Sequence, residues 1–194
     1  GKSSGCTTDA GYSGAVTAAT TDPYYTSTLK AKICTCDGGT PTVASGTGAT
    51  LCDIAGVDCS VCNPGFTISG TAAAGSAQIC NANTCTATQV LNSDRSATGA
   101  ITGTTSSTTA VACDAGYTGG GTSTCGNNGK FNTLTCSSKT CTPSGNVAHS
   151  NKATAGSITG HTGQDVTVEC DRGFDGGGTV TCGKDGLFNT VTCA

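Results

Sequence analysis

Cysteine is the residue type with the greatest chemical potential in this sequence. The chain has 15 cysteines among 194 residues, or about 8%, which is close to the content of disulfide scaffolds. A thiolate can act as a nucleophile, as a zinc ligand or as one half of a disulfide. Thiols at this density persist as disulfides only in oxidising compartments. The composition therefore predicts a secreted protein that is extracellular or held at a cell surface.

The segment Cys59-Ser-Val-Cys62 has the spacing of a redox or zinc motif. A redox Cys-x-x-Cys pair lies where a strand meets a helix, and no helical pattern follows this one. A zinc site would need a second pair of ligands and a reducing environment that keeps the thiolates free. Structural disulfides are the favoured interpretation. We expect no bound metal and no cofactor.

Two histidines, His149 and His161, are the only imidazoles available as general acids or bases. Catalysis requires a nucleophile or an acid–base pair within reach of the reacting atoms. His149 lies in a polar segment, and His161 aligns with Thr104 of an internal repeat, so one copy of that repeat lacks the imidazole. No serine-hydrolase elbow, zinc-protease or phosphate-loop motif is present. The sequence predicts that the chain is not an enzyme and has no catalytic residues.

The charge and hydropathy of the chain exclude two further classes of partner. The net charge is −3 and charged residues make up 11% of the chain. Nucleic-acid binding needs clustered Lys and Arg, and here the nine basic residues are scattered. No apolar run reaches 18 residues, so we expect no membrane span in this segment.

An internal repeat organises the second half of the chain. Residues 99–136 and 156–193 align without gaps at an offset of 57 and are identical at 22 of 38 positions. A further cysteine precedes each copy, so each unit has four cysteines. We place the two modules at 85–136 and 141–194, with a linker at 137–140.

Short strands separated by glycine-rich turns are the expected secondary structure. In the second copy Val166, Val168 and Cys170 alternate with polar residues, which is typical of a half-buried strand. Glu occurs once and aromatic residues make up 4% of the chain, so neither long helices nor a large core is favoured. The sequence predicts an all-β chain of small disulfide-rich modules in tandem, with short strands, Gly-rich turns and little or no helix.

The cysteine pattern of each repeat resembles the sushi (complement control protein) module. Shared features are an opening cysteine, Val-x-Cys, Gly before Tyr or Phe, Thr-x-Cys, and a closing cysteine after an aromatic residue. The usual Trp before the closing cysteine is replaced by Phe131 and Phe188. The sequence itself leaves three pairings open in each module. The resemblance implies first-to-third and second-to-fourth bonds: Cys85–Cys125, Cys113–Cys136, Cys141–Cys182 and Cys170–Cys193.

Residues 34–84 hold six cysteines with a different spacing. These are Cys34, Cys36, Cys52, Cys59, Cys62 and Cys80. Together with the segment Cys62-Asn-Pro-Gly-Phe66, they make this region similar to an EGF-like cysteine-rich module. The pairing within the six stays open. No acidic run precedes the first of them, so we expect no calcium.

Residues 1–33 form an N-terminal segment with a single cysteine, Cys6. Subtracting six, four and four bonded cysteines from 15 leaves one over. Cys6 is therefore the candidate for a disulfide between chains. The cysteine-poor stretch from Val16 to Leu29 is a candidate strand that could add to a sheet edge of another copy. The alternative for this segment is a frayed tail.

Hydroxyl-rich runs are candidates for covalent O-glycosylation. A surface with few charges needs another source of solubility, and attached sugar supplies it. The alternative is that threonine is here simply a strand residue. The candidate positions are Thr104, Thr105, Ser106, Ser107, Thr108, Thr109, Thr133 and Thr135.

Two functions fit these features. The first is structural: a protomer of a glycosylated filament, cell-surface appendage or wall assembly whose partners are copies of itself, since non-closing contacts between copies make fibres. The second is a surface adhesin or receptor fragment that binds proteins or glycans, including other surface glycoproteins. Binding would need exposed aromatic or Arg anchors. Tyr117 and Phe174 occupy equivalent repeat positions and are expected in the core, which favours the structural function.

Overall fold

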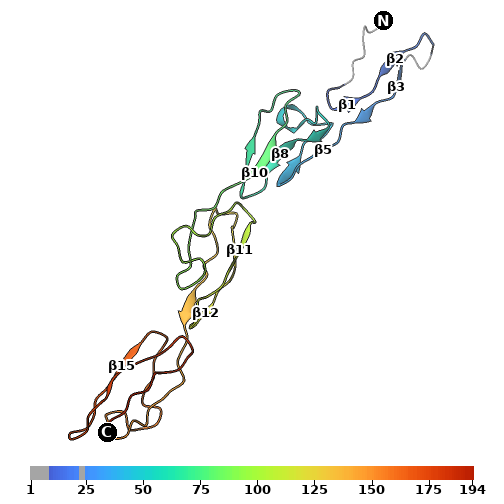
Figure 1. The fold of residues 1–194 in the computed structure, drawn as a ribbon. Coiled ribbons are helices and arrows are strands. Elements are labelled where there is room, and N and C mark those ends of the chain that lie inside the picture. Colours follow the sequence, from blue (N-terminus) through green and yellow to red (C-terminus); the bar gives the residue numbers. More distant parts are fainter. Residues whose placement is uncertain (1–8, 22–24) are drawn as a thin grey trace. The chain divides into compact units, whose positions relative to one another are not determined.

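A computed structural model defines residues 9–21 and 25–194 of the chain (Figure 1). The chain divides into two compact units. The first comprises Gly1–Cys85 with two short later segments, Thr104–Ser106 and Cys125–Lys130. The second comprises Thr86–Gly103, Ser107–Thr124 and Phe131–Ala194. Each unit is described separately.

All strands are short, and each pairs with one partner in a two-stranded sheet. The strands of the first unit are β1 (Tyr12–Ser13), β2 (Val16–Ala18), β3 (Tyr25–Ser27), β4 (Lys30–Ala31), β5 (Cys34–Thr35), β6 (Gly39–Pro41), β7 (Gly56–Val57), β8 (Cys59–Cys62), β9 (Phe66–Ser69) and β10 (Ile79–Ala82). Those of the second are β11 (Thr108–Val111), β12 (Tyr117–Gly119), β13 (Gly121–Thr124), β14 (Cys136–Ser138), β15 (Asp165–Val168) and β16 (Gly178–Thr181). The described residues include one 3-10 turn, η1 (Gly48–Thr50), and no α-helix. The prediction of a small disulfide-rich all-β fold is confirmed.

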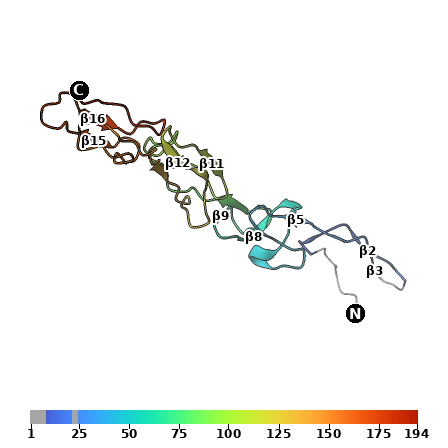
Figure 2. The ribbon, with the colours of Figure 1, turned by 90° about the horizontal axis from the view of Figure 1, so that it is seen from below.

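The repeat seen in the sequence is also a repeat of strand pairing. In the first copy β11 pairs antiparallel with β13, and Val111 lies opposite Gly121. In the second copy β15 pairs antiparallel with β16, and Val168 lies opposite Gly178; Figure 2 shows these two strands side by side. The same register recurs because the same glycine-rich corner separates the two strands of each pair.

The second unit contains two small apolar clusters at equivalent repeat positions. The first is built on Val90, Ile101, Val111 and Cys136, with Phe131 and Leu134 packed against it. The second is built on Ile158, Val168 and Val180, with Val147, Phe188 and Val191 packed against it. Each cluster has only a few aliphatic residues and one phenylalanine. Apolar burial on this scale supplies limited stability, which is the usual situation in domains that rely on cross-links.

Sulfur and hydrogen bonds take the place of apolar residues in the core of the first unit. Cys52 and Cys59 are fully buried there. The Asp58 side chain is also buried, and its carboxylate accepts hydrogen bonds from the Thr42 hydroxyl at 2.7 Å and the Gln78 backbone amide at 2.8 Å. A buried carboxylate is tolerated when its oxygens have such partners.

Seven disulfides link all 14 cysteines of the described residues. In residues 34–84 the bonds are Cys34–Cys52, Cys36–Cys59 and Cys62–Cys80. In the two repeats they are Cys85–Cys125, Cys113–Cys136, Cys141–Cys182 and Cys170–Cys193. The four bonds of the repeats join first to third and second to fourth cysteines, which is the pairing that the sushi resemblance implies.

Removing the second disulfide of either repeat should cost a similar free energy of unfolding. Cys113–Cys136 and Cys170–Cys193 both span 23 residues, and a loop of this size contributes about 3 kcal/mol in the loop-entropy account. We expect the double variants C113A/C136A and C170A/C193A to lose about that much in urea unfolding of the non-reduced chain. The exposed T133V substitution is the control and should change little. A loss under about 1 kcal/mol in the double variants would contradict the importance of the bonds.

Candidate functional site

A four-residue turn recurs along the chain. Three copies are Asn63–Phe66, Asp114–Tyr117 and Asp171–Phe174, and the glycine in third position of each has φ of 89°, 86° and 93° respectively. The amide of the aromatic residue in fourth position donates to the carbonyl of the first residue at 3.1, 3.0 and 3.0 Å. Positive φ only at the third residue is the type II geometry, which glycine adopts without strain.

The first of these turns binds the loop of the module that follows it. The Gly65 carbonyl accepts two hydrogen bonds, one from the Asn83 backbone amide at 2.8 Å and one from the Thr105 hydroxyl at 2.6 Å. The Thr105 amide in turn donates to the Asn83 carbonyl at 2.8 Å. A Cβ on Gly65 would lie 2.7 Å from the Thr105 methyl group, so only glycine fits. These contacts place Thr104–Ser106 in the first unit.

The second turn makes the same set of contacts, which we call a joint, inside the second unit. The Gly116 carbonyl accepts from the Lys139 backbone amide and from the Thr162 hydroxyl, both at 2.8 Å. The Thr162 amide donates to the Lys139 carbonyl at 2.9 Å. A Cβ on Gly116 would lie 2.6 Å from the Thr162 methyl group. Two different segments of the chain thus build the same joint from the same atoms.

The first disulfide of each module holds the threonine loop in place. Cys125 is bonded to Cys85, and its carbonyl accepts the amide of Ser106, next to Thr105, at 2.8 Å. In the second module the Cys182 carbonyl accepts the Gly163 amide at 2.8 Å in the same way. The cysteines of both bonds are almost fully buried. The loop is therefore tied to its own module as well as to the preceding turn.

A related turn near the N-terminus, Asp9–Tyr12, is contacted by a different segment and a different side chain. The Tyr12 amide donates to the Asp9 carbonyl at 3.0 Å, and the Gly11 carbonyl accepts the Lys32 backbone amide at 2.9 Å. The Lys32 ammonium donates to the Ala10 carbonyl at 2.6 Å and to the Asp53 carbonyl. Lys32 stands two residues before Cys34, just as Lys139 stands two residues before Cys141. The lysine ammonium donates to carbonyls other than that of the turn glycine, so this contact shares only the backbone bond with the two threonine joints.

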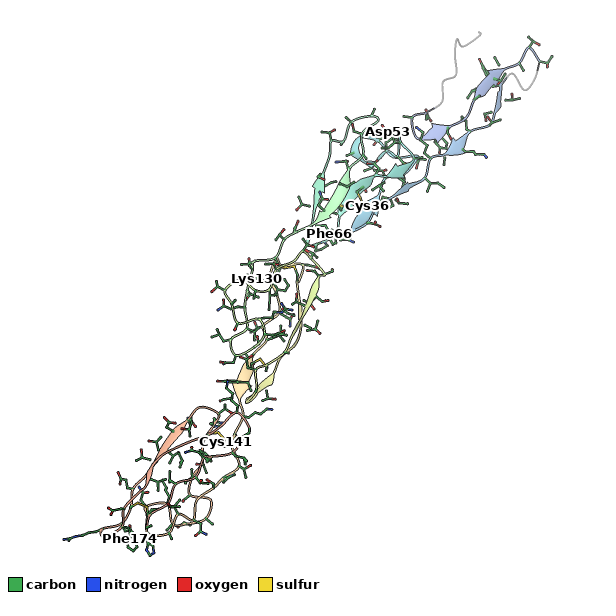
Figure 3. The ribbon with its side chains drawn as sticks, viewed as in Figure 1. Cys36, Asp53, Phe66, Lys130, Cys141 and Phe174 are labelled. Carbon is green, nitrogen blue, oxygen red and sulfur yellow. A yellow bond between two sulfur atoms is a disulfide. The ribbon has the colours of Figure 1, made fainter. Side chains whose placement is uncertain are left out.

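Among the described residues, no following segment covers the turn Asp171–Phe174. Gly173 is exposed, and a Cβ added to it would meet nothing within 4 Å. Phe174 is 36% exposed, and its ring stacks on the His149 imidazole with centroids 3.8 Å apart. Figure 3 shows Phe174 at the end of its module that is remote from Cys141. The expectation that Phe174 is a core residue is wrong, because nothing covers this turn. Its equivalent Tyr117 does pack against an apolar cluster.

The hydroxyl run at 104–109 is only partly available to modifying enzymes. Thr105 is 6% exposed and its hydroxyl is bonded to Gly65, so Thr105 is wrong as a glycosylation candidate. Ser107 and Thr109 are half-buried. The remaining candidates are exposed: Thr104, Ser106, Thr108, Thr133 and Thr135.

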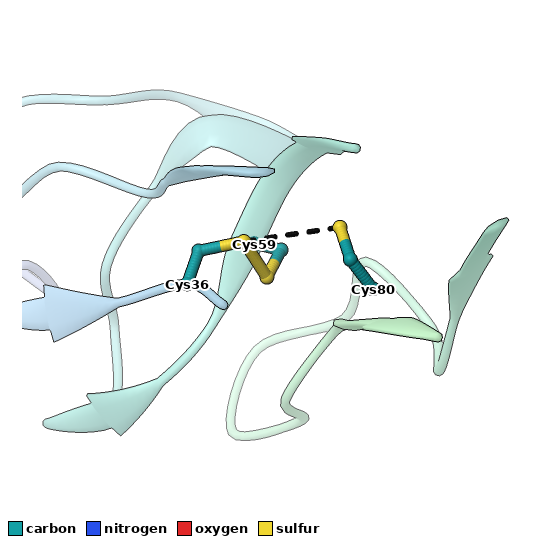
Figure 4. A group of neighbouring side chains, drawn as sticks. All are labelled: Cys36, Cys59 and Cys80. Atoms are coloured by element: carbon teal, nitrogen blue, oxygen red, sulfur yellow. Dashed lines mark hydrogen bonds between the residues drawn. A yellow bond between two sulfur atoms is a disulfide. The ribbon is translucent and has the colours of Figure 1, made fainter. Parts of the chain in front are cut away.

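Three cysteine sulfurs gather in the first unit, those of Cys36, Cys59 and Cys80, all within 4.8 Å of one another. The Sγ atoms of Cys36 and Cys80 are 3.8 Å apart (Figure 4). Each sulfur is in a disulfide and carries no proton, so the contact is packing between two bonds rather than a hydrogen bond. Cys59 and Cys62 bind different partners, so the Cys-x-x-Cys segment is not a redox pair here. Cys6 lies outside the described residues.

Sequence reasoning missed the junction residues although the signals were present. Thr105 and Thr162 are identical at an offset of 57, and the Gly-aromatic pair occurs in each module.

No protein-family model matches the chain, and no similar curated protein is found. In the described part of the chain, no helix has the length and apolar character needed to cross a membrane.

Removing the hydroxyl of Thr105 or of Thr162 should weaken the joint that it forms without disturbing the disulfides. We expect T105V and T162V each to lose about 1 kcal/mol of stability, because the shape is kept and one hydrogen bond is lost. Amide exchange should speed up at Asn83 in T105V and at Lys139 in T162V, as measured by NMR. The exposed T133V and T190V substitutions are the matched controls. Unchanged exchange at both amides would show that the hydroxyls do not hold the joints.

Proposed function

We propose that the chain is an extracellular, non-enzymatic structural protein, a protomer of a filament, surface appendage or wall assembly. The observation that carries the proposal is the repeated joint at Gly65 and Gly116. A joint formed twice from backbone atoms, glycine and threonine is suited to linking successive units, and it offers no reactive group. Catalytic sites instead gather groups with perturbed acidity in a cleft.

The location follows from the same chemistry. Seven disulfides in the described residues are typical of secreted and extracellular proteins. We propose in particular a location at a cell surface. Disulfides suit an exposed structural protein because they keep small modules folded without a large core.

We propose that the two repeats are sushi-like modules and that residues 34–84 are an EGF-like module. The pairing of the four cysteines in each repeat supports the first assignment. Phe131 and Phe188, which stand where the family has Trp, each pack against the apolar cluster of their module. The position thus keeps a packed aromatic residue, which also supports the assignment.

We propose that the N-terminal segment, residues 1–33, links protomers. Within the described residues β1 pairs with β4 and β2 with β3. Among the described residues β1 and β2 each pair with a strand on one edge only, and an open edge of a strand can accept a strand from another chain. Cys6 would add a covalent bond between copies.

A surface adhesin or receptor fragment is the second candidate function. It is favoured by the exposed His149–Phe174 stack and by a cavity of about 460 Å³ in the same module, lined by Val147, Phe188 and Val191 among others. An exposed aromatic pair can stack on the apolar face of a sugar or anchor a protein. We place it second because the stack carries few polar groups that could orient a ligand.

Truncation tests the linking role of the N-terminal segment. Negative-stain micrographs of native material should show fibres, and a chain lacking residues 1–33 should remain a soluble monomer in analytical ultracentrifugation. C6S separates the thiol from the strands, and we expect it to give assemblies that dissociate more readily. Filaments that persist unchanged after truncation would refute the linking role.

Intact mass tests the glycan proposal. If sugar supplies solubility, native protein should exceed the sequence mass of 18.7 kDa by multiples of a hexose residue. Peptide mapping should place the sugar on exposed hydroxyls such as Thr104 and Thr133, and leave Thr105 bare. A native mass equal to that of the bare chain would remove the proposal.

A further inference from the structure

The four turns of the described residues differ in what covers them. Gly11, Gly65 and Gly116 are buried beneath following segments, whereas Gly173 is exposed. The aromatic residues in fourth position follow the same pattern, because only Phe174 is exposed and the other three are half-buried. The Gly173 turn has the conformation of the Gly65 and Gly116 turns but lacks their covering.

The local geometry of the open turn is already that of an acceptor. Its φ of 93° compares with 89° at Gly65 and 86° at Gly116. The Phe174 amide is bonded to the Asp171 carbonyl at 3.0 Å, so the turn is closed without a partner. No rearrangement is needed before the Gly173 carbonyl can accept hydrogen bonds. Preformed acceptors of this kind bind with little ordering cost.

The two filled joints define the chemistry of the missing partner. It must present a backbone amide two residues before its first cysteine, as Asn83 and Lys139 do. It must also present a threonine hydroxyl 20 or 21 residues after that cysteine, as Thr105 and Thr162 do. Both groups converge on one carbonyl, and a threonine methyl group fills the space left by the missing Cβ. A small anion or a metal ion does not offer this combination.

We propose that the turn Asp171–Phe174 is a docking surface for a further module of the same repeat. The module binds with its pre-cysteine amide and its loop threonine on the Gly173 carbonyl, as the second repeat binds on Gly116. Docking also covers the exposed Phe174 ring. The inference rests on the proposed function, because it names a contact, distinct from the N-terminal segment, by which a further module joins the assembly.

The test attaches a copy of residues 137–194 directly after Cys193 of the full chain. The appended lysine then stands at the spacing from Gly173 that Lys139 has from Gly116. Hydrogen exchange measured by NMR compares the backbone amide of Lys139 with that of the appended lysine within one molecule. We expect the appended amide to be protected at least tenfold over an unstructured peptide and within about tenfold of Lys139. Free exchange at the appended amide, with Lys139 still protected, would overturn the proposal.

Three variants of the extended chain sharpen the result. In the appended copy, the equivalent of T162V should speed exchange of the lysine amide several-fold, and the equivalent of T190V, an exposed threonine, should leave it unchanged. G173N should remove the protection, because asparagine tolerates positive φ and its side chain would occupy the space of the threonine methyl group. Protection that survives G173N would show that the module contacts another surface.

Failure of this inference is distinguishable from failure of the proposed function. An unprotected appended module together with fibrous native material would overturn the docking surface and leave the structural function standing. A protected appended module together with monomeric native material would support the docking surface and overturn assembly as the function.

Discussion

The disulfide made by the first cysteine of each repeat sets the geometry on which its joint depends. Cys85–Cys125 and Cys141–Cys182 tie the start of a module to the strand that flanks its threonine loop. Without them the loop would be held by a few backbone hydrogen bonds, in modules whose apolar clusters have only four and six aliphatic residues. On the loop-entropy account each of these longer bonds contributes about 4 kcal/mol, which is comparable with the whole stability of a small domain.

The joints themselves are made mostly by the main chain. At Gly65 and Gly116 the acceptor is a carbonyl, one donor is an amide, and the only side-chain donor is a threonine hydroxyl. Glycine is required in the turn for two reasons, positive φ and the approach of the threonine methyl group. Such a contact is short-ranged and directional, so it fixes register more than it supplies affinity.

The sequence allowed the fold class to be predicted because cysteine count, repeat length and alternating valines all act locally. The bonds among the six cysteines of residues 34–84 could not be derived, since six cysteines allow fifteen pairings. Thr105 was misassigned as a surface hydroxyl because threonine occurs equally in strands, loops and buried bonds. Phe174 was misassigned because repeat equivalence with Tyr117 predicts the same local packing but not whether a neighbour covers it. The repeated threonine and the Gly-aromatic pair are visible in the sequence, but the joints require two distant segments to meet, and their contact is not visible there.

Asn83 and Lys139 occupy the same place at the two joints and differ in charge and size, yet both bond the turn glycine and the loop threonine through the backbone amide and carbonyl. Asn127 and Lys184 likewise approach the turn glycines through Cα rather than through their side-chain ends. The identity of most residues at a joint is therefore free to drift while the joint is kept. The joint therefore constrains the turn glycine, the loop threonine and the main chain of the pre-cysteine residue, and it constrains the neighbouring side chains less.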